Sequence, residues 1–444
     1  MNLNSYPPVN VGLLGLGTVG GGVTRVLARN AEEISRRAGR EIVITHAAAR
    51  NLDTTTANTA GMKLTGEALD VVDDPEVAVI VELMGGYEPA RGLVLRALAN
   101  GKHVVTANKA LIARHGNEIF AAARATGMMV GFEAAVAGGI PIIKAIREGL
   151  AGNRLEWVAG IINGTTNFIL TEMRDKGRDF PKVLAEAQAL GYAEADPTFD
   201  IEGIDAAHKL TILASIAFGI PLQFDKVYIE GISRITREDV VYARQFGYRI
   251  KHLGIARRDE QGAQLRVHPT LIPQQHLLSS VNGVMNAVLV NGDAVGQSLF
   301  YGAGAGAEPT ASAVVADLVD VVHTLTADPE NRVPHLAFQP DALSDLPVLP
   351  MESVETACYL RLQAHDRPGV LAEVTRILAD RDISIEAVLQ KRAKPSASAS
   401  DVPIILLTHS VREQRMNEAI AAIEALDSIS APVMRIRVEP LDSD

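Results

Sequence analysis

The feature that most constrains this chain is the glycine-rich turn Gly15-Leu16-Gly17-Thr18-Val19-Gly20, which directly follows the apolar run Val9–Leu14. A helix-like stretch from Gly21 to Ala38 comes next, so the order is strand, glycine turn and helix. In such a turn the first glycine permits a tight bend, the second lets the backbone approach a pyrophosphate, and the third allows close helix packing. The pattern therefore predicts a dinucleotide site that includes Gly15, Gly17 and Gly20, in preference to a plain glycine-rich turn.

An alternation of strands and helices continues after this turn. Each glycine or polar break falls at the end of an expected strand, which is where open α/β sheets bind their ligands. The series predicts a doubly wound parallel sheet of the Rossmann type, and therefore the α/β class. Its further strands are expected at Glu41–Ala49, Val77–Leu83, His103–Thr106 and Met128–Phe132.

Two basic residues stand at strand ends in this series. Arg50 follows the second strand where an Asp or Glu would bind a ribose 2′-hydroxyl, so the arginine suits a 2′-phosphate and favours NADP, or the use of both NADP and NAD. A solvated arginine is the alternative. Lys109 lies at the mouth of the sheet, directly before an apolar helix, and the residues alone leave a functional role and a solvated lysine equally open.

The middle of the chain carries the candidate chemistry. Asp205 and Lys209 lie four residues apart on one face of a helix that continues as the apolar run Leu210–Phe218, which predicts that the pair is buried. An exposed ion pair is the alternative. With the acidic loop Gly191–Asp200, the pair suits a cationic substrate whose carbonyl is reduced, because a carboxylate binds the ammonium while a lysine protonates or polarises the oxygen.

Two further segments are rich in small residues. The turn Glu133–Pro141 could direct several carbonyl oxygens at one cation, although its spacing alone favours a close-packed turn. The loop Tyr301–Gly306 opens an apolar helix, and both close approach to a cofactor and tight packing of that helix explain its glycines.

A domain boundary is expected near residue 350. Prolines at 329, 334, 340, 347 and 350 indicate a linker or surface arm, and the segment after residue 354 predicts the order βαββαβ, with a loop at Lys394–Ser400. Domains are thus expected at 1–145 (nucleotide binding, completed by about 300–328), 146–300 (substrate binding, catalysis and dimerisation, α+β), 329–353 (linker) and 354–444 (a ferredoxin-like βαββαβ domain).

Composition restricts the cellular compartment and the classes of binding partner that we expect for this chain. The net charge is 42 − 53 = −11, which argues against a nucleic-acid binder. The chain has one cysteine, Cys358, and no Lys or Arg among its first 24 residues, which favours a reducing cytoplasm over secretion. The longest apolar stretch, near Leu210–Leu222, is too short to span a membrane.

The chain contains, in this order, the motifs Gly15–Gly20, Ala107–Leu111, Asn163–Asn167, Gly191-Tyr192 with Glu194 and Asp196-Pro197, Asp205 with Lys209, and Gly302–Gly306. Taken together, these motifs resemble homoserine dehydrogenase. The resemblance covers residues 9 to 325 and implies NAD(P)-dependent interconversion of L-aspartate 4-semialdehyde and L-homoserine, on the route to threonine and methionine. It implies Lys209 as proton donor, Glu194 and Asp205 as substrate ligands, and Lys109 as a second lysine near nicotinamide and substrate.

The resemblance also implies ligands. Thr18, Val19, Gly191 and Gly306 look like cofactor contacts, and the turn after Phe132 matches a sodium site with oxygen ligands from Glu133, Val136, Gly138 and Ile140. The C-terminal order and the turn Asp366-Arg367-Pro368-Gly369 resemble an ACT domain, which implies an amino-acid effector, threonine, bound near Asp366 and Gly369, and a homodimer or homotetramer.

Three alternatives stay open: a C-terminal domain that only dimerises, a non-catalytic amino-acid sensor on a Rossmann scaffold, and a Rossmann reductase for another small substrate. The retained Lys209 disfavours the sensor, and the retained Glu194 and Asp205 disfavour the other reductase.

Overall fold

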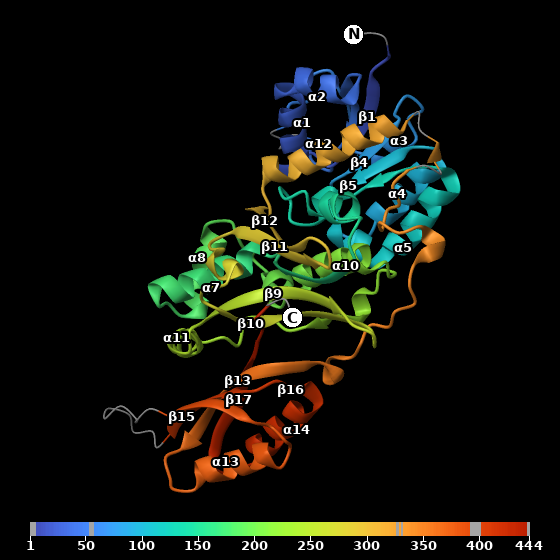
Figure 1. Ribbon diagram of the computed structural model, residues 1–444. Helices are drawn as coiled ribbons and strands as arrows, with labels where there is room; N and C mark the ends of the chain where they lie inside the picture. The colour runs from blue at the N-terminus through green and yellow to red at the C-terminus, as the bar shows by residue number, and fades with distance from the viewer. Residues whose placement is uncertain (1–5, 53–56, 326–327, 330–331, 391–400, 442–444) are drawn as a thin grey trace. The chain divides into compact units, whose positions relative to one another are not determined.

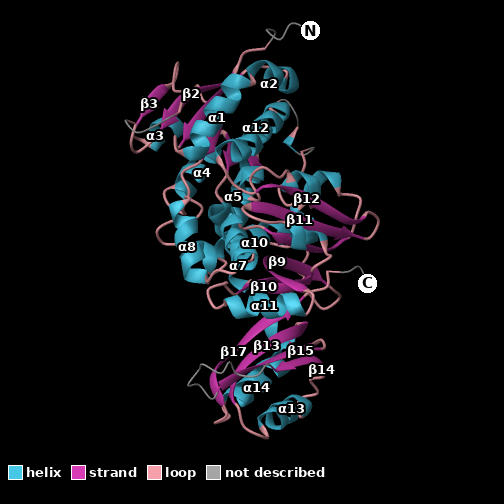
Figure 2. Ribbon diagram, turned by 90° about the vertical axis from the view of Figure 1, so that its left-hand side faces the viewer, coloured by secondary structure: helices cyan, strands magenta, loops and turns pink. Residues whose placement is uncertain are grey.

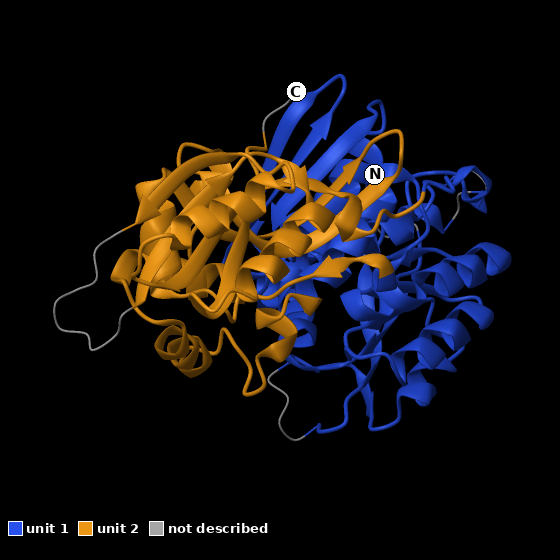
Figure 3. Cartoon of the chain, turned by 90° about the horizontal axis from the view of Figure 1, so that it is seen from below, with its two compact units in different colours: residues 1–164, 205–225, 284–346 blue, residues 165–204, 226–283, 347–444 orange. Residues whose placement is uncertain are grey.

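The computed structural model describes residues 6–52, 57–325, 328–329, 332–390 and 401–441. The chain divides into two compact units (Figure 3): unit 1 comprises residues 1–164, 205–225 and 284–346, and unit 2 comprises 165–204, 226–283 and 347–444. Within the described ranges, no helix is both long enough and apolar enough to cross a membrane. The domain boundaries expected from the sequence stay a prediction, and the loop expected at Lys394–Ser400 lies outside the described residues.

Unit 1 contains a parallel sheet in the order β3-β2-β1-β4-β5-β6, which confirms the predicted α/β class (Figure 1). Its strands are β1 (Val9–Leu14), β2 (Ile42–Ala48), β3 (Lys63–Thr65), β4 (Val79–Glu82), β5 (His103–Thr106) and β6 (Val130–Gly131). Its helices are α1 (Thr18–Arg29), α2 (Ala31–Ala38), α3 (Ala68–Val72), α4 (Ala90–Ala99), α5 (Lys109–Thr126) and α12 (Ala307–Thr324).

The parallel sheet and its helices depart from the sequence prediction at β3, at the first helix and at β6. The strand β3 has no counterpart among the expected strands. The helix expected from Gly21 to Ala38 is two helices, because the backbone of Asn30 leaves helical geometry (φ −110°, ψ 21°) between α1 and α2. The strand expected at Met128–Phe132 shortens to β6, because Phe132 (φ −147°, ψ 24°) already turns the chain into the short 3₁₀ turn that follows.

The helix α12 comes late in the sequence but packs beside α1 on the parallel sheet (Figure 1). Leu13 of β1, Val23 of α1, and Val314 and Leu318 of α12 are fully buried in one apolar cluster. Burying a side chain of this size contributes about 2 kcal/mol. The long-range packing of α12 therefore completes the core under the glycine-rich turn.

The rest of unit 1 combines an antiparallel strand group with a buried helix. The strands β7 (Leu155–Ile161), β11 (Met285–Gly292) and β12 (Gly296–Ala303) pair in the order β12-β11-β7. Every residue of α10 (Ile204–Phe218) after the first is buried, so this helix is a core helix with no solvated face. Asp205 and Lys209 lie on it.

Unit 2 begins with α7 (Gly164–Lys176), which starts at the unit boundary, and continues with α8 (Phe180–Ala189), α9 (Thr198–Ile201), β8 (Tyr228–Ile229), α11 (Arg237–Gln245), β9 (Tyr248–Arg258) and β10 (Ala263–Pro273). The antiparallel hairpin β9-β10 adds β8 and β17 as parallel neighbours of β10.

The C-terminal part of unit 2 confirms the predicted βαββαβ order, with one short extra strand, β16 (Val411–Arg412). The sheet runs β17-β13-β15-β14 and is antiparallel, and two helices cover one face of it (Figure 2). The other elements are β13 (Glu355–His365), α13 (Val370–Ala379), β14 (Ile385–Gln390), β15 (Asp401–Thr408), α14 (Glu413–Glu424) and β17 (Ile429–Val438).

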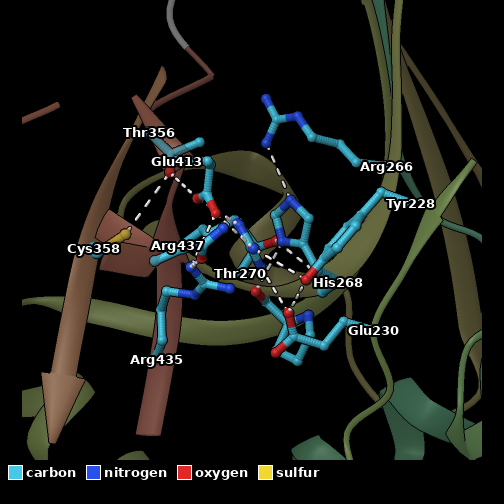
Figure 4. Close-up of polar contacts among 12 residues, drawn as sticks. Tyr228, Glu230, Arg266, His268, Thr270, Thr356, Cys358, Glu413, Arg435 and Arg437 are labelled. Carbon is cyan, nitrogen blue, oxygen red and sulfur yellow. Dashed lines mark hydrogen bonds and ion pairs between the residues drawn. The ribbon is translucent and has the colours of Figure 1, made fainter. Parts of the chain in front are cut away.

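Buried polar groups join this C-terminal sheet to β8 and β10 (Figure 4). The guanidinium of Arg437 donates to both carboxylate oxygens of Glu413 (2.8 and 2.9 Å) and to Glu230 (2.7 Å). Glu413 also accepts a hydrogen bond from Thr356 (2.6 Å). A separate ion pair joins Arg361 of β13 to Asp239 of α11, so charged groups as well as apolar surface hold this part of unit 2 together.

Candidate active site

The glycine-rich turn between β1 and α1 has a different constraint at each glycine. Gly15 adopts φ +104°, and a side chain there would meet the carbonyl oxygen of Leu83 at 2.7 Å. A side chain at Gly20 would meet the carbonyl oxygen of Gly15 at 2.1 Å, so this glycine allows close packing. At Gly17 a Cβ would meet nothing within 4 Å. The turn thus leaves open space over Gly17, directly before Thr18 and Val19 at the N-terminus of α1, which fits a pyrophosphate.

The second glycine loop reaches the same region. Gly306 (φ +127°) precedes α12, and a Cβ at Gly22 of α1 would meet the carbonyl oxygen of Ala307 at 2.3 Å. The N-terminal half of α1 and the first residue of α12 are therefore in direct contact, which is the tight packing that the sequence offered as one explanation of this loop. Arg50, the candidate for a 2′-phosphate, is exposed just after β2, the neighbour of β1.

The ends of β4 and β5 are organised by one buried carboxylate. Glu82 accepts hydrogen bonds from the N–H of Met84 (2.8 Å) and from the hydroxyl of Thr106 (2.6 Å). Asn108 then caps α5 through Leu111 N–H (3.1 Å) and donates to the carbonyl of Gly86 (2.7 Å). These contacts hold the two strand ends together and fix the backbone that carries Lys109.

Lys109 and Lys209 share one carboxylate, that of Asp205. Lys109 Nζ lies 2.8 Å from Oδ1 of Asp205, and Lys209 Nζ lies 2.7 Å from Oδ2. The side chain of Asp205 is 3% exposed and that of Lys209 10%, which confirms the predicted burial of the pair, whereas that of Lys109 is 36% exposed. The cluster therefore has a closed side at Lys209 and an accessible side at Lys109.

Electrostatics keep Asp205 ionised. Burial by itself would raise the pKa of this carboxyl, but the attraction of Lys209 and Lys109 outweighs burial and holds the pKa well below its usual range. Lys209 Nζ also donates to the carbonyl of Ile162 (2.8 Å), so its position is fixed by two acceptors. A fixed ammonium beside a permanently ionised carboxylate can donate a proton to, or polarise, a substrate oxygen.

Sequence patterns gave no role to the residues that surround this cluster. Asn163, which entered the sequence analysis only as part of the motif Asn163–Asn167, donates to Oδ2 of Asp205 (2.8 Å). His208 contacts the Tyr87 hydroxyl through Nε2 (3.3 Å) and stacks on the ring of Phe224. Burial, and then repulsion by neighbouring cations, lowers the pKa of His208 to about 4 despite the attraction of Asp205, so it is neutral at pH 7. The position of His208 directly before Lys209 was the available signal.

The remaining predicted substrate and cofactor residues, Gly191 and Glu194, belong to unit 2. Gly191 (φ +75°) follows α8, and both residues are exposed on the loop between α8 and α9. The hydroxyl of Thr165 donates to the carbonyl of Tyr192 (2.6 Å) and anchors this loop to α7. The structure therefore brings together Lys109, Asp205 and Lys209 in unit 1, while Glu194 is an accessible carboxylate of unit 2.

The predicted sodium turn is buried and tightly packed in unit 1. Glu133, Val136, Gly138 and Ile140 are all buried, and a Cβ at Gly138 would meet the carbonyl oxygen of Gly304 at 2.7 Å. The Glu133 carboxylate accepts hydrogen bonds from the N–H groups of Ile143 (2.9 Å) and Lys144 (2.8 Å), and burial raises its pKa to about 7. The chemistry of the donor set, carbonyl oxygens with one carboxylate, suits a hard monovalent cation.

Comparison with known proteins agrees with this architecture. The model of the family "Homoserine dehydrogenase" matches residues 141–319, that of "Homoserine dehydrogenase, NAD binding domain" matches residues 15–133, and that of "ACT domain" matches residues 359–428. A homoserine dehydrogenase of Pseudomonas aeruginosa is 68% identical, covering 98% of this chain and 100% of the relative. One of Neisseria gonorrhoeae is 55% identical, covering 98% and 99%.

A solved structure is similar throughout. The crystal structure of a homoserine dehydrogenase from Thiobacillus denitrificans superposes with a TM-score of 0.94 at 68% identity, covering 98% of this chain and 99% of that one. The parallel sheet with its glycine-rich turn, together with the matched NAD-binding domain, defines an NAD(P)-dependent oxidoreductase. Within that class, the chain belongs to the homoserine dehydrogenase family, with an ACT domain at its C-terminal end.

Proposed function

We propose that this chain interconverts L-aspartate 4-semialdehyde and L-homoserine, with the residues of the Asp205 cluster at the reacting carbonyl. The observation that carries the proposal is the Asp205 carboxylate held between the ammonium groups of Lys109 and Lys209, at 2.8 and 2.7 Å. The arrangement suits reduction of an aldehyde, in which a proton must reach the oxygen as hydride reaches the carbon.

Each residue has a distinct role in this proposal. Lys209 donates the proton to the developing alkoxide, and Asp205 orients that ammonium and binds the substrate hydroxyl or amino group. Glu194, exposed on its loop, binds the substrate ammonium. Lys109, the accessible lysine, lies next to the reacting carbon and the cofactor. Bound NAD(P)H supplies the hydride, and Gly15, Gly17, Thr18, Val19, Gly20, Gly191 and Gly306 are the residues proposed to hold it.

The test is the initial rate of NADPH and NADH oxidation with aspartate semialdehyde. We expect Lys209→Ala to lower kcat by about 10²–10⁴-fold, the range of general acid catalysis, while the exposed Lys182→Ala control retains the wild-type rate. Wild-type protein that binds threonine but oxidises neither nucleotide would instead support the non-catalytic sensor.

Cofactor preference rests on Arg50 in this proposal. An Arg50→Ala variant should raise KM for NADPH more than KM for NADH, because only NADPH carries the 2′-phosphate. Equal changes in both KM values would remove Arg50 from the cofactor site.

Sodium is proposed at Glu133, Val136, Gly138 and Ile140. Replacing sodium chloride by tetramethylammonium chloride should lower the thermal midpoint of wild-type protein, because a bound ion stabilises the folded state by mass action. An unchanged midpoint would argue for a turn that is only close-packed.

Feedback control by threonine is proposed through the turn Asp366–Gly369. Gly369 has φ +96°, so any side chain there is strained, and Asp366, which is exposed, offers the cleaner variant. Asp366→Ala should keep turnover and lose inhibition by threonine. Full inhibition in this variant would contradict the assignment, and a pure dimerisation domain predicts no inhibition in wild type either. We also propose that the protein is a homodimer or homotetramer, which sedimentation velocity tests, and that it works in the cytoplasm.

A further inference from the structure

A cavity of about 490 Å³ lies in unit 2, lined by side chains of α7, α11 and β9. Three of its lining residues are arginines from different elements: Arg174 of α7, Arg244 of α11 and Arg249 of β9. None of the residues proposed for substrate, nucleotide, sodium or threonine lines it. The cavity is therefore not part of the sites described above.

Positive charge exceeds negative charge in the lining. Asp175 is the carboxylate among the lining residues, so the formal balance is 3 − 1 = +2. Asp175 is already bound by the guanidinium of Arg174, at 2.7 and 2.9 Å. Among the described residues, Arg244 and Arg249 have no salt-bridge partner, and Arg249 donates to the carbonyl of Ser279 (2.9 Å). Arg244 and Arg249 therefore line the cavity without an ion-pair partner among the described residues.

The arginines are close enough to repel one another. The pKa of Arg249 is lowered first by burial and then by repulsion from Arg174, and Arg244 adds to that repulsion against the attraction of Asp175. Grouped like charges cost free energy unless an anion joins them. A ligand anion would relieve this repulsion.

A fourth cation lies nearby. Lys251 of β9 is buried, and its ammonium donates to Oδ1 of Asn167 (3.1 Å) and to the carbonyl of Val281. Burial, followed by repulsion from Arg174 and Arg249, lowers the pKa of Lys251 to about 7. Burial raises the pKa of Tyr248, and the charge of Glu386 of β14 adds to that rise. The cationic side chains at and near the cavity therefore outnumber the carboxylates of Asp175 and Glu386.

The rest of the lining is apolar or neutral. Leu170, Val240 and Ile250 supply aliphatic surface, while Tyr248 and Gln274 supply neutral polar groups. Guanidinium groups bind phosphate oxygens bidentately, and a cavity of this size holds a small organic molecule. We propose that this cavity binds a small phosphate ester, with the dianionic phosphate between Arg244 and Arg249 and an apolar body against Leu170, Val240 and Ile250.

Isothermal titration calorimetry of the full chain with phenyl phosphate tests the proposal. Saturating NADP⁺ is present throughout so that the glycine-rich turn is not an available phosphate site, and sodium chloride keeps the ionic strength constant. We expect one phenyl phosphate per chain, with inorganic phosphate binding more weakly because it lacks the apolar body. Arg244→Gln and Arg249→Gln should each weaken binding about tenfold or more, the loss expected for one charge-assisted contact.

The matched control is Arg154→Gln, an exposed arginine of unit 1, which changes the net charge equally and should leave the affinity unchanged. Arg244 is exposed on α11, so its variant tests the site without risk to the core, and unchanged circular dichroism checks both variants. The proposal would be overturned by absence of heat with wild type or by wild-type affinity for phenyl phosphate in both the Arg244 and Arg249 variants. Affinity of the wild type for neutral phenol equal to that for phenyl phosphate would also overturn it. Loss of reductase activity would bear on the proposed function only, because binding is measured without turnover.

Discussion

Replacing Arg437 by methionine should loosen β17 against the rest of unit 2. Arg437 is 1% exposed and makes a bidentate pair with Glu413, whose side chain is also 1% exposed (Figure 4). Methionine keeps much of the apolar stem but leaves the Glu413 carboxylate buried. Burial alone would raise the pKa of Glu413, and the attraction of Arg437 is the largest influence that lowers it.

The expected loss of stability depends on the partners that Glu413 keeps after the substitution of Arg437. Breaking one partner of a buried pair costs about 3–5 kcal/mol. Arg435 (3.0 Å) and Thr356 (2.6 Å) still contact Glu413, so the loss should lie near the lower limit, about 3 kcal/mol or roughly a hundredfold in the opening equilibrium.

Hydrogen exchange of peptides covering β17, followed by mass spectrometry, measures this opening. We expect exchange to be about a hundredfold faster in Arg437→Met, and the double variant with Glu413→Gln to recover at least half of the loss, because removing both charges leaves no unpaired one. The control Arg415→Met removes an exposed pair with Asp382 and should change exchange less than about fivefold. Exchange in Arg437→Met within about threefold of wild type, or additive effects in the double variant, would refute the reasoning.

Three other perturbations have defined outcomes. Burial, followed by the charge of Arg332, lowers the pKa of His103 from 6.5 to about 4. Its Nδ1 accepts a hydrogen bond from Met129 N–H (2.9 Å). Because the folded protein favours the neutral imidazole, the contribution of His103 to the free energy of unfolding is present above pH 6.5 and is lost as pH falls toward 4. His103→Asn keeps a hydrogen-bond acceptor and should reduce this loss of stability by up to about 3 kcal/mol. Urea denaturation of the wild type and the variant at pH 7 and pH 4.5 measures the difference. Equal losses of stability in the two proteins would contradict the argument. Gly17→Ala should raise KM for NADPH with an unchanged thermal midpoint, since its Cβ points into open space; a lowered midpoint would show that the space is not open. Gly20→Ala should lower both the midpoint and nucleotide affinity, because its Cβ would lie 2.1 Å from a backbone oxygen, and a variant as stable as wild type would disprove that contact.

Local pattern predicted much of the fold. The strand Val9–Leu14 and the strand His103–Thr106 have the predicted bounds, and the βαββαβ order of the C-terminal part is also confirmed. These features depend on apolar periodicity and on turn residues, which act within a few positions along the chain. The breaks at Asn30 and Phe132 were missed because they depend on single backbone conformations and not on a pattern.

The candidate site also has features that local sequence predicts and features that depend on tertiary packing. The sequence by itself determined that Asp205 and Lys209 share a buried helix face, because their spacing and the apolar run that follows are local properties. Only the tertiary structure decided that Lys109, from the end of β5, reaches the same carboxylate, and that Arg174, Arg244 and Arg249 line one cavity. The residues next to a charged side chain in the sequence do not reveal its ion-pair partner, because that partner depends on how distant elements pack and exclude water.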